Sequence, residues 1–475
     1  MNRGGVSSLF WGCALAVSAA CGQVDKRDQQ SAPEGGGGQV AGGVVRPNVG
    51  GTSSTEGGAR PILPEGGAPP TPIEGGAPAI APEGGAPPIL SEGGAPPILS
   101  EGGAPPILSE GGAGGMADGC ALPLRFRAPP PLIVGSRPLW VAAADIDADG
   151  KMDLVTTSQL SPYIGVTFGK GSTSFESLAL YPTGPTEYMG QGVVADLTGD
   201  GLVDIAVASS TGVRVLVNRG NREFDEPITL PFDVVPIALT AAELSGDTLL
   251  DLAVVTDTYT VSVLLNQGGG MFAEPEAYLS GEGPRDVAAG DVNDDGVADL
   301  VVANGLGTSV SVLLNLGAGV FDDPVKYEVG SAPISVALID LDADGDRDIA
   351  AANFGSNDVA VLLNREQGEF DPAVAYPVEG GSPYSLAATD LTHDGAPELV
   401  VANAGGSNVS LLVNGGDGSF LKSVDYLVGL SPVSVTLADF NGDSSVDIAA
   451  ADYNYGDGSV AMSGLVKVLF NRCQP

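Results

Sequence analysis

The sequence predicts an all-β fold, a seven-bladed β-propeller preceded by a disordered tether rich in glycine and proline. The main observation is a nine-residue acidic loop, followed each time by a short apolar run, that recurs every 47 to 51 residues. The loops begin at Asp145, Asp196, Glu243, Asp291, Asp340, Asp390 and Asp439. A period of this size with β-type patterning is typical of propellers, and seven loops predict seven blades.

Each repeat also contains four short segments with strand patterning. In the copy at residues 333–377, PISVALID leads into the acidic loop, and IAAAN, DVAVLLN and GEFDPAVAYPV follow it. Short runs of β-branched and small residues between glycine and asparagine turns indicate a four-stranded blade. We expect the propeller to occupy residues 120–475.

The seventh repeat shows no fourth strand after LVKVLFN, but the segment LRFRAPPPLIVG, before the first repeat, has the phasing of one. Its Phe126 corresponds to Phe370 and Phe420 of other repeats. We therefore expect this segment to complete the last blade and close the ring, which removes an exposed sheet edge. Closure would bring Cys120 and Cys473 close enough for a disulfide; two free thiols are the alternative.

Residues 1–21 have the pattern of an export signal, with Arg3 before an apolar stretch from Val6 to Val17. Small residues precede Cys21, as in the lipobox of bacterial lipoproteins, so we expect an acylated Cys21 that anchors the protein at the cell surface or in the periplasm. Cleavage after Ala20 and secretion is the alternative. Residues 22–119 are mainly Gly, Pro, Ala and Glu and cannot bury a core, so we expect a disordered linker acting as a spacer rather than a modification or partner site.

The formal net charge is −39, from 59 acidic and 20 basic residues. Such a surface repels phosphate backbones, so we expect no nucleic-acid partner and no membrane contact other than the lipid anchor. The single histidine, His393, excludes a His-based triad and a multi-His zinc site. We assign no catalytic residues.

The acidic loops carry the ligand chemistry of a calcium site, since calcium takes six to eight hard oxygen ligands. In DIDADGKMD, the expected ligands are Asp145, Asp147, Asp149, the carbonyl of Lys151, and Asp153. The expected ligands elsewhere are Asp196, Thr198, Asp200 and Asp204; Asn293 and Asp291, Asp295 and Asp299; Asp340, Asp342, Asp344 and Asp348; Asp390, Thr392, Asp394 and Glu398; and Asp439, Asn441, Asp443 and Asp447.

The loops differ in quality. Those at Asp145, Asp291 and Asp340 are the strongest, and the loop at Asp439 has Ser444 where glycine is expected. The loop at Glu243 has Thr248 at the turn, where a β-branched residue disfavours positive φ, so we expect it to bind calcium weakly or not at all. The alternative for all seven is a simple Asx-type turn between strands.

With these D-x-D-x-D-G-x-x-D loops about 49 residues apart, residues 120–475 resemble the FG-GAP or VCBS repeat family. Its members are seven-bladed propellers of integrin α-subunits and many bacterial surface proteins. The resemblance implies calcium loops on one face and ligand loops on the other. The family contains adhesins, lectins and propellers attached to hydrolases or lyases, so the resemblance does not fix an activity.

On the opposite face the expected ligand residues are Trp140, Tyr188, Arg285, Phe354, Tyr384, Tyr453 and Tyr455. Exposed aromatic rings stack on sugars or anchor proteins, and packing around the central channel is the alternative. Our first hypothesis is a tethered, monomeric, non-catalytic adhesion or recognition module for a glycan or an extracellular protein. The second is a calcium-dependent polysaccharide-degrading enzyme, and the third is a purely structural surface component.

Overall fold

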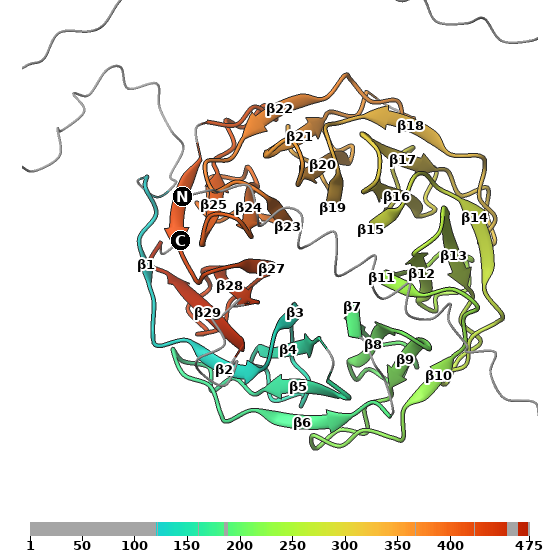
Figure 1. Ribbon diagram of the computed structural model, residues 1–475, viewed down its shortest axis with the longest axis horizontal. Coiled ribbons are helices and arrows are strands. Elements are labelled where there is room, and N and C mark those ends of the chain that lie inside the picture. The colour runs from blue at the N-terminus through green and yellow to red at the C-terminus, as the bar shows by residue number, and fades with distance from the viewer. Residues whose placement is uncertain are drawn as a thin grey trace, which may run out of the picture. The chain divides into compact units, whose positions relative to one another are not determined.

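The computed structural model describes Cys120 and residues 122–473, apart from residues 160, 185–188, 366, 422 and 454–463. The regular elements of this part are all strands, which form seven antiparallel sheets arranged in a ring (Figure 1). The prediction of a seven-bladed β-propeller is confirmed. None of its segments is a helix that could cross a lipid bilayer. The export signal, Cys21 and the linker at residues 22–119 lie outside the described residues.

Each blade contributes one innermost strand, which borders the centre of the ring in Figure 1. These strands are β3 (Pro138–Ala144), β7 (Met189–Ala195), β11 (Pro236–Ala242), β15 (Pro284–Gly290), β19 (Pro333–Ile339), β23 (Pro383–Thr389) and β27 (Pro432–Ala438). The second strands are β4 (Asp153–Ser158), β8 (Asp204–Ser209), β12 (Asp251–Thr256), β16 (Asp299–Asn304), β20 (Asp348–Asn353), β24 (Glu398–Asn403) and β28 (Asp447–Asp452). We number the blades 1 to 7 from β3.

The third strands are β5 (Tyr163–Thr167), β9 (Gly212–Leu216), β13 (Thr260–Leu264), β17 (Ser309–Leu313), β21 (Asp358–Leu362), β25 (Asn408–Leu412) and β29 (Gly464–Asn471). The outermost strands are β6 (Ala179–Pro182), β10 (Ile228–Leu230), β14 (Glu276–Leu279), β18 (Val325–Glu328), β22 (Val374–Pro377) and β26 (Val424–Leu427). In blade 7 this place is taken by β1 (Phe126–Arg127) and β2 (Leu132–Gly135), both of which pair with β29.

Apolar layers between adjacent blades form the core. Every residue of the second strands is buried. These strands are rich in Val, Ile, Leu and Ala, the composition expected where both faces of a strand are covered. One layer packs Val301 of β16 with Ile349 of β20, and equivalent layers join other neighbouring blades. The loops at the strand ends are therefore held on a rigid frame.

The N-terminal segment closes the ring as the sequence predicted. Phe126 pairs with Asn471, the last residue of β29, just as Phe370 pairs with Asn364 in blade 5. The ring of Phe126 meets Tyr426 of blade 6 edge-on, with centroids 4.8 Å apart. Other blades repeat this tyrosine–phenylalanine contact, so the segment takes the place of an ordinary fourth strand.

A disulfide joins the two ends of this closure. Cys120 and Cys473 are bonded, with their Cα atoms 5.8 Å apart and a separation of 353 positions in sequence. The backbone N–H of Cys120 also donates to the carbonyl of Thr392 at 3.0 Å. The covalent link therefore lies beside the acidic loop of blade 6.

Candidate functional site

The seven acidic loops connect the first strand of each blade to the second, so they share one face of the propeller. In the loop that begins at Asp340, Oδ1 accepts a hydrogen bond from the N–H of Ala343 at 2.8 Å, and Oδ2 accepts from Gly345 at 3.1 Å. The first acidic residue of every other loop also accepts backbone N–H groups of its own loop, Glu243 through Oε1 alone. Each loop therefore folds around its first carboxylate.

The sixth residue of each loop makes the turn in the left-handed region of backbone space. Gly345 has a φ of 103°, and glycine takes this place in four other loops. Thr248 adopts a φ of 77° and Ser444 a φ of 70° at the same position, although side chains disfavour this region. The loop at Glu243 therefore forms with a strained threonine, and its weak calcium binding stays a prediction.

The ninth residue of each loop is a buried acid at the start of the second strand. Asp348 accepts the N–H of Leu341 at 2.7 Å through one oxygen and the N–H of Asn364 at 2.8 Å through the other. The same pair of contacts recurs at Asp153, Asp204, Asp251, Asp299 and Asp447. Burial raises the pKa of Asp348 to about 6, because the charged form loses its water, while the two hydrogen bonds act against this.

Two loops bring three carboxylates together. One oxygen from each of Asp145, Asp147 and Asp149 lies within 4.8 Å of the others, and so do oxygens of Asp340, Asp342 and Asp348. In the first group the ninth residue, Asp153, is not a member, and in the second Asp344 is not. Among the described residues, no other loop forms a group of three.

The residue at position three accounts for the absence of such a group of three carboxylates from the other five loops, as far as the structure describes them. It is Asp in the two clustered loops and a hydrogen-bond donor elsewhere, where it bonds to a carboxylate of its own loop. These pairs are Thr198–Asp196, Ser245–Glu243, Asn293–Asp295, Thr392–Glu398 and Asn441–Asp447. The carboxylate at position five accepts the N–H two residues later in all seven loops: Asp149, Asp200, Asp247, Asp295, Asp344, Asp394 and Asp443.

A row of asparagines that was not predicted from the sequence ties six of the seven loops to the next blade. They follow the third strands or end them, at Asn218, Asn266, Asn315, Asn364, Asn414 and Asn471. Each side-chain Nδ2 donates to the carbonyl of the second loop residue in the preceding blade, at 2.7 to 3.0 Å. Blade 1 has Gly169 at this position, where a Cβ atom would meet the carbonyl of Met152 at 2.2 Å. The recurring Leu-Asn, Val-Asn or Phe-Asn at the end of the third strand or just after it was the signal for these residues.

The repeats match a known family of sequence repeats. The FG-GAP-like repeat matches five overlapping stretches, residues 196–254, 243–302, 291–351, 340–401 and 390–450, each running from one acidic loop to beyond the next. The chain belongs to the FG-GAP-like repeat family. No curated protein matches it at the level of sequence.

Several solved structures are similar to this FG-GAP-like propeller at low identity. BBS1N in complex with ARL6DN gives a TM-score of 0.52 at 14% identity, over 73% of this chain and 96% of that one. A virginiamycin B lyase from Staphylococcus aureus gives 0.49 at 11%, over 73% and 98%. An Agrocybe aegerita lectin that recognises non-reducing terminal N-acetylglucosamine gives 0.46 at 20%, over 74% and 86%. At such identities the likeness concerns the fold alone.

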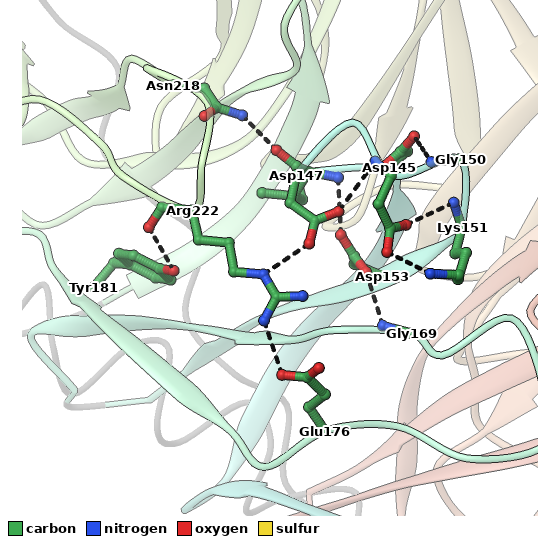
Figure 2. Close-up of polar contacts among 12 residues, drawn as sticks. Asp145, Asp147, Gly150, Lys151, Asp153, Gly169, Glu176, Tyr181, Asn218 and Arg222 are labelled. Carbon is green, nitrogen blue, oxygen red and sulfur yellow. Dashed lines mark hydrogen bonds and ion pairs between the residues drawn. The ribbon is translucent and has the colours of Figure 1, made fainter.

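In blade 1 of the FG-GAP-like propeller, basic side chains reach the carboxylate cluster (Figure 2). Lys151 Nζ lies 2.6 Å from Asp149 Oδ2, and this ion pair lowers the pKa of Asp149. Arg222 Nε, from the hairpin of blade 2, lies 2.7 Å from Asp147 Oδ2. Lys151 was predicted to offer its backbone carbonyl; the contact seen here is made by its side chain. Arg222 was not among the site residues predicted from the sequence.

The predicted ligand face needs correction at three positions. Trp140, Phe354 and Tyr453 are only 9%, 7% and 3% exposed, so they are packing residues and not an open aromatic surface. Trp140 lies in the apolar layer between blades 1 and 2 of the FG-GAP-like propeller. Tyr453 donates a hydrogen bond to Gln159. Tyr188 and Tyr455 lie outside the described residues.

Arg285 and Tyr384 remain partly exposed, and both occupy a special place in the FG-GAP-like fold. Each is the second residue of an innermost strand, at an irregularity in the register with the second strand. The equivalent residues in four other blades are Leu139, Ile237, Ile334 and Val433. Such bulges re-aim a side chain. Arg285 is the charged residue among these six equivalent positions.

Proposed function

We propose that this FG-GAP-like propeller is a non-catalytic recognition module, stabilised by calcium on one face and binding an acidic glycan at the centre of the other. A propeller of this family fits a recognition or binding module. The single observation that carries the ligand side is Arg285. Among the described residues, no hydrogen bond or ion pair engages its guanidinium, in a chain whose formal net charge is −39.

The calcium side is supported by the loop at Asp340. Asp342 Oδ1 is buried and has no hydrogen-bond partner in the described residues, and oxygens of Asp340 and Asp348 lie within 4.8 Å of it. A buried carboxylate oxygen without a donor is costly unless a cation binds it. Burial, followed by the nearby charge of Asp344, raises the pKa of Asp342. Asp340, Asp342 and Asp348 would hold calcium, which would neutralise their mutual repulsion and stabilise the loop.

The ligand side lies away from these loops. Strand β15 begins at Pro284 and runs to Gly290, directly before the acidic loop, so Arg285 is about 17 Å from that face. Burial raises the pKa of Tyr384, and the nearby positive charge of Arg285 acts in the opposite direction. A cation whose charge reaches an aromatic side chain suits a sugar that carries a carboxylate or sulfate, because the guanidinium would pair with the anion and the ring would contact the sugar.

The N-terminal part of the proposal is a lipid anchor on Cys21 and a spacer at residues 22–119 that holds the propeller away from a membrane. Incorporation of a labelled fatty acid into the full chain, and its loss in Cys21→Ser, tests the anchor. Labelling that persists in Cys21→Ser would contradict acylation at this cysteine.

The ligand proposal is tested by screening the full chain on an array of neutral, carboxylated and sulfated glycans. We expect binding to an acidic class, reduced about tenfold or more in Arg285→Gln. Lys326→Gln is the matched control, because it removes one positive charge from an exposed position on the outermost strand β18. A blank array from folded protein rejects the glycan and directs the search to protein partners. Shortened polysaccharide products would instead favour the enzyme.

A further inference from the structure

The hairpin between the third and fourth strands contains one residue that departs from the repeat. At the position two before the hairpin phenylalanine, blades 3 to 6 have Gly270, Gly319, Gly368 and Gly418, with φ between 70° and 78°. Blade 2 has Arg222 there, with a φ of 66°. A long side chain in the left-handed region is strained, and such strain persists only where surrounding contacts offset it.

The backbone at this position is otherwise ordinary. Tyr181 of blade 1 donates a hydrogen bond from its hydroxyl to the carbonyl of Arg222 at 3.0 Å. Tyr278 makes the same bond to Gly319 at 3.1 Å. The path of the chain is therefore shared between blades, and what blade 2 adds is the arginine side chain.

This side chain makes its contacts with blade 1 (Figure 2). The guanidinium carbon lies 3.9 Å from the centroid of the Phe168 ring. Nε lies 2.7 Å from Asp147 Oδ2, and Nη1 lies 2.8 Å from Glu176 Oε2. The side chain of Asp147 is only 7% exposed, so this carboxylate is largely covered. A planar guanidinium that stacks on a ring and binds two carboxylates is geometrically fixed, which a lysine could not reproduce.

Asp147 is also the position-three residue of the first carboxylate cluster. Its counterpart in blade 5, Asp342, has a buried Oδ1 that finds no hydrogen-bond partner among the described residues, whereas Asp147 has an arginine on Oδ2. No ion pair to Asp340, Asp342 or Asp348 is formed by the described residues. Two loops of almost the same sequence therefore differ in their counter-ion.

We propose that Arg222 is the built-in counter-ion of the first acidic loop, where it holds Asp147 across the junction of blades 1 and 2 and competes with calcium for that carboxylate. The inference rests on the proposed calcium binding of the acidic loops. It changes the order expected from sequence: the loop at Asp145 binds calcium more weakly than the loop at Asp340, although both carry four carboxylates.

Calcium titration of the full chain by calorimetry tests this. We expect Arg222→Gln to show a site about tenfold tighter than in the wild type, because the competing charge is gone. Arg219→Gln is the matched control. Arg219 is in the same hairpin, but its side chain is 59% exposed and forms its ion pair with Asp225 rather than with Asp147. This gain in calcium affinity should disappear in the double variant Arg222→Gln/Asp147→Asn.

Arg222→Gly is a second variant that cannot fail through backbone strain, because glycine is the residue of blades 3 to 6. Arg222→Gly should show the same gain in calcium affinity as Arg222→Gln. Calcium binding in Arg222→Gln and Arg222→Gly that is unchanged or weaker overturns the inference.

Asp342→Asn separates this result from the proposed function. Wild-type binding that Asp342→Asn removes, with no gain in Arg222→Gln, leaves the calcium proposal standing and rejects the role of Arg222. Absence of calcium binding in every variant rejects both.

Discussion

Asn364 reaches from blade 5 into the acidic loop of blade 4, where its Nδ2 donates to the carbonyl of Val292 at 2.8 Å. The same nitrogen donates to the carbonyl of Arg347 within its own blade at 3.1 Å. Asn364 is 4% exposed, so both hydrogen bonds lie in the interior of the junction. Equivalent asparagines make this hydrogen bond at six of the seven junctions between blades, counting Asn364. The acidic loops therefore help to join neighbouring blades.

Replacing this asparagine should weaken the propeller. We expect Asn364→Ala to lower the free energy of unfolding by about 2 kcal/mol, because it leaves buried carbonyl groups without a donor. Urea unfolding followed by circular dichroism measures it. Gln267→Ala is a suitable control, since Gln267 is exposed and follows the equivalent Asn266. Equal stability of the two variants would show that the junction does not depend on this bond.

The disulfide should stabilise the closed ring. Replacing both Cys120 and Cys473 by alanine is expected to cost about 2 to 5 kcal/mol, because the link constrains a long loop of the unfolded chain. Thermal unfolding with and without a reductant is the measurement. The reductant should lower the midpoint of the wild type and leave the double variant unchanged. A wild type insensitive to reductant would mean that strand pairing of β1 and β2 suffices.

Calcium should raise the unfolding temperature, and Asp342 should carry part of that effect. We expect the wild type to unfold several degrees higher in millimolar calcium than in chelator. Asp342→Asn should reduce this difference, since it removes one ligand charge from the cluster. Asp323→Asn, which removes an exposed carboxylate elsewhere, should retain it. The idea fails if the two variants respond to calcium alike.

The pH dependence of stability should contain a contribution from Asp286. Burial raises the pKa of Asp286 to about 6, while the N–H of Val336 and other hydrogen bonds act against this. The folded protein therefore binds a proton more tightly than the unfolded chain. The resulting contribution of Asp286 to the free energy of unfolding is fully present below about pH 4 and is lost as the pH rises through about 6. It amounts to at most about 3 kcal/mol, since the side chain is partly exposed.

Asp286→Asn tests this, because the amide does not titrate. Between pH 4 and 7 the free energy of unfolding should fall less steeply in Asp286→Asn than in the wild type. Chemical denaturation at several pH values in chelator measures both slopes. Parallel slopes would mean that Asp286 keeps an ordinary pKa.

The sequence predicted much of the architecture because the period and the strand pattern are local. Seven acidic loops gave seven blades, and the place of Phe126 in the last blade followed from its phasing against Phe370 and Phe420. The asparagines at the junctions were within reach of the same reasoning, since Asn364 and its equivalents recur with the repeat.

By itself, the sequence determined the number of blades, the closing strand and the position of every acidic loop, because these depend on spacing along the chain. Only the tertiary structure decided which side chains meet across blades. It buried Trp140 and Tyr453, left Arg285 partly exposed, and placed Arg222 on Asp147, 75 residues earlier in the chain. Contacts between neighbouring blades depend on how the sheets pack face to face, which spacing along the chain does not specify. A repeat pattern also cannot predict the contacts of a residue such as Arg222, which stands where blades 3 to 6 have glycine.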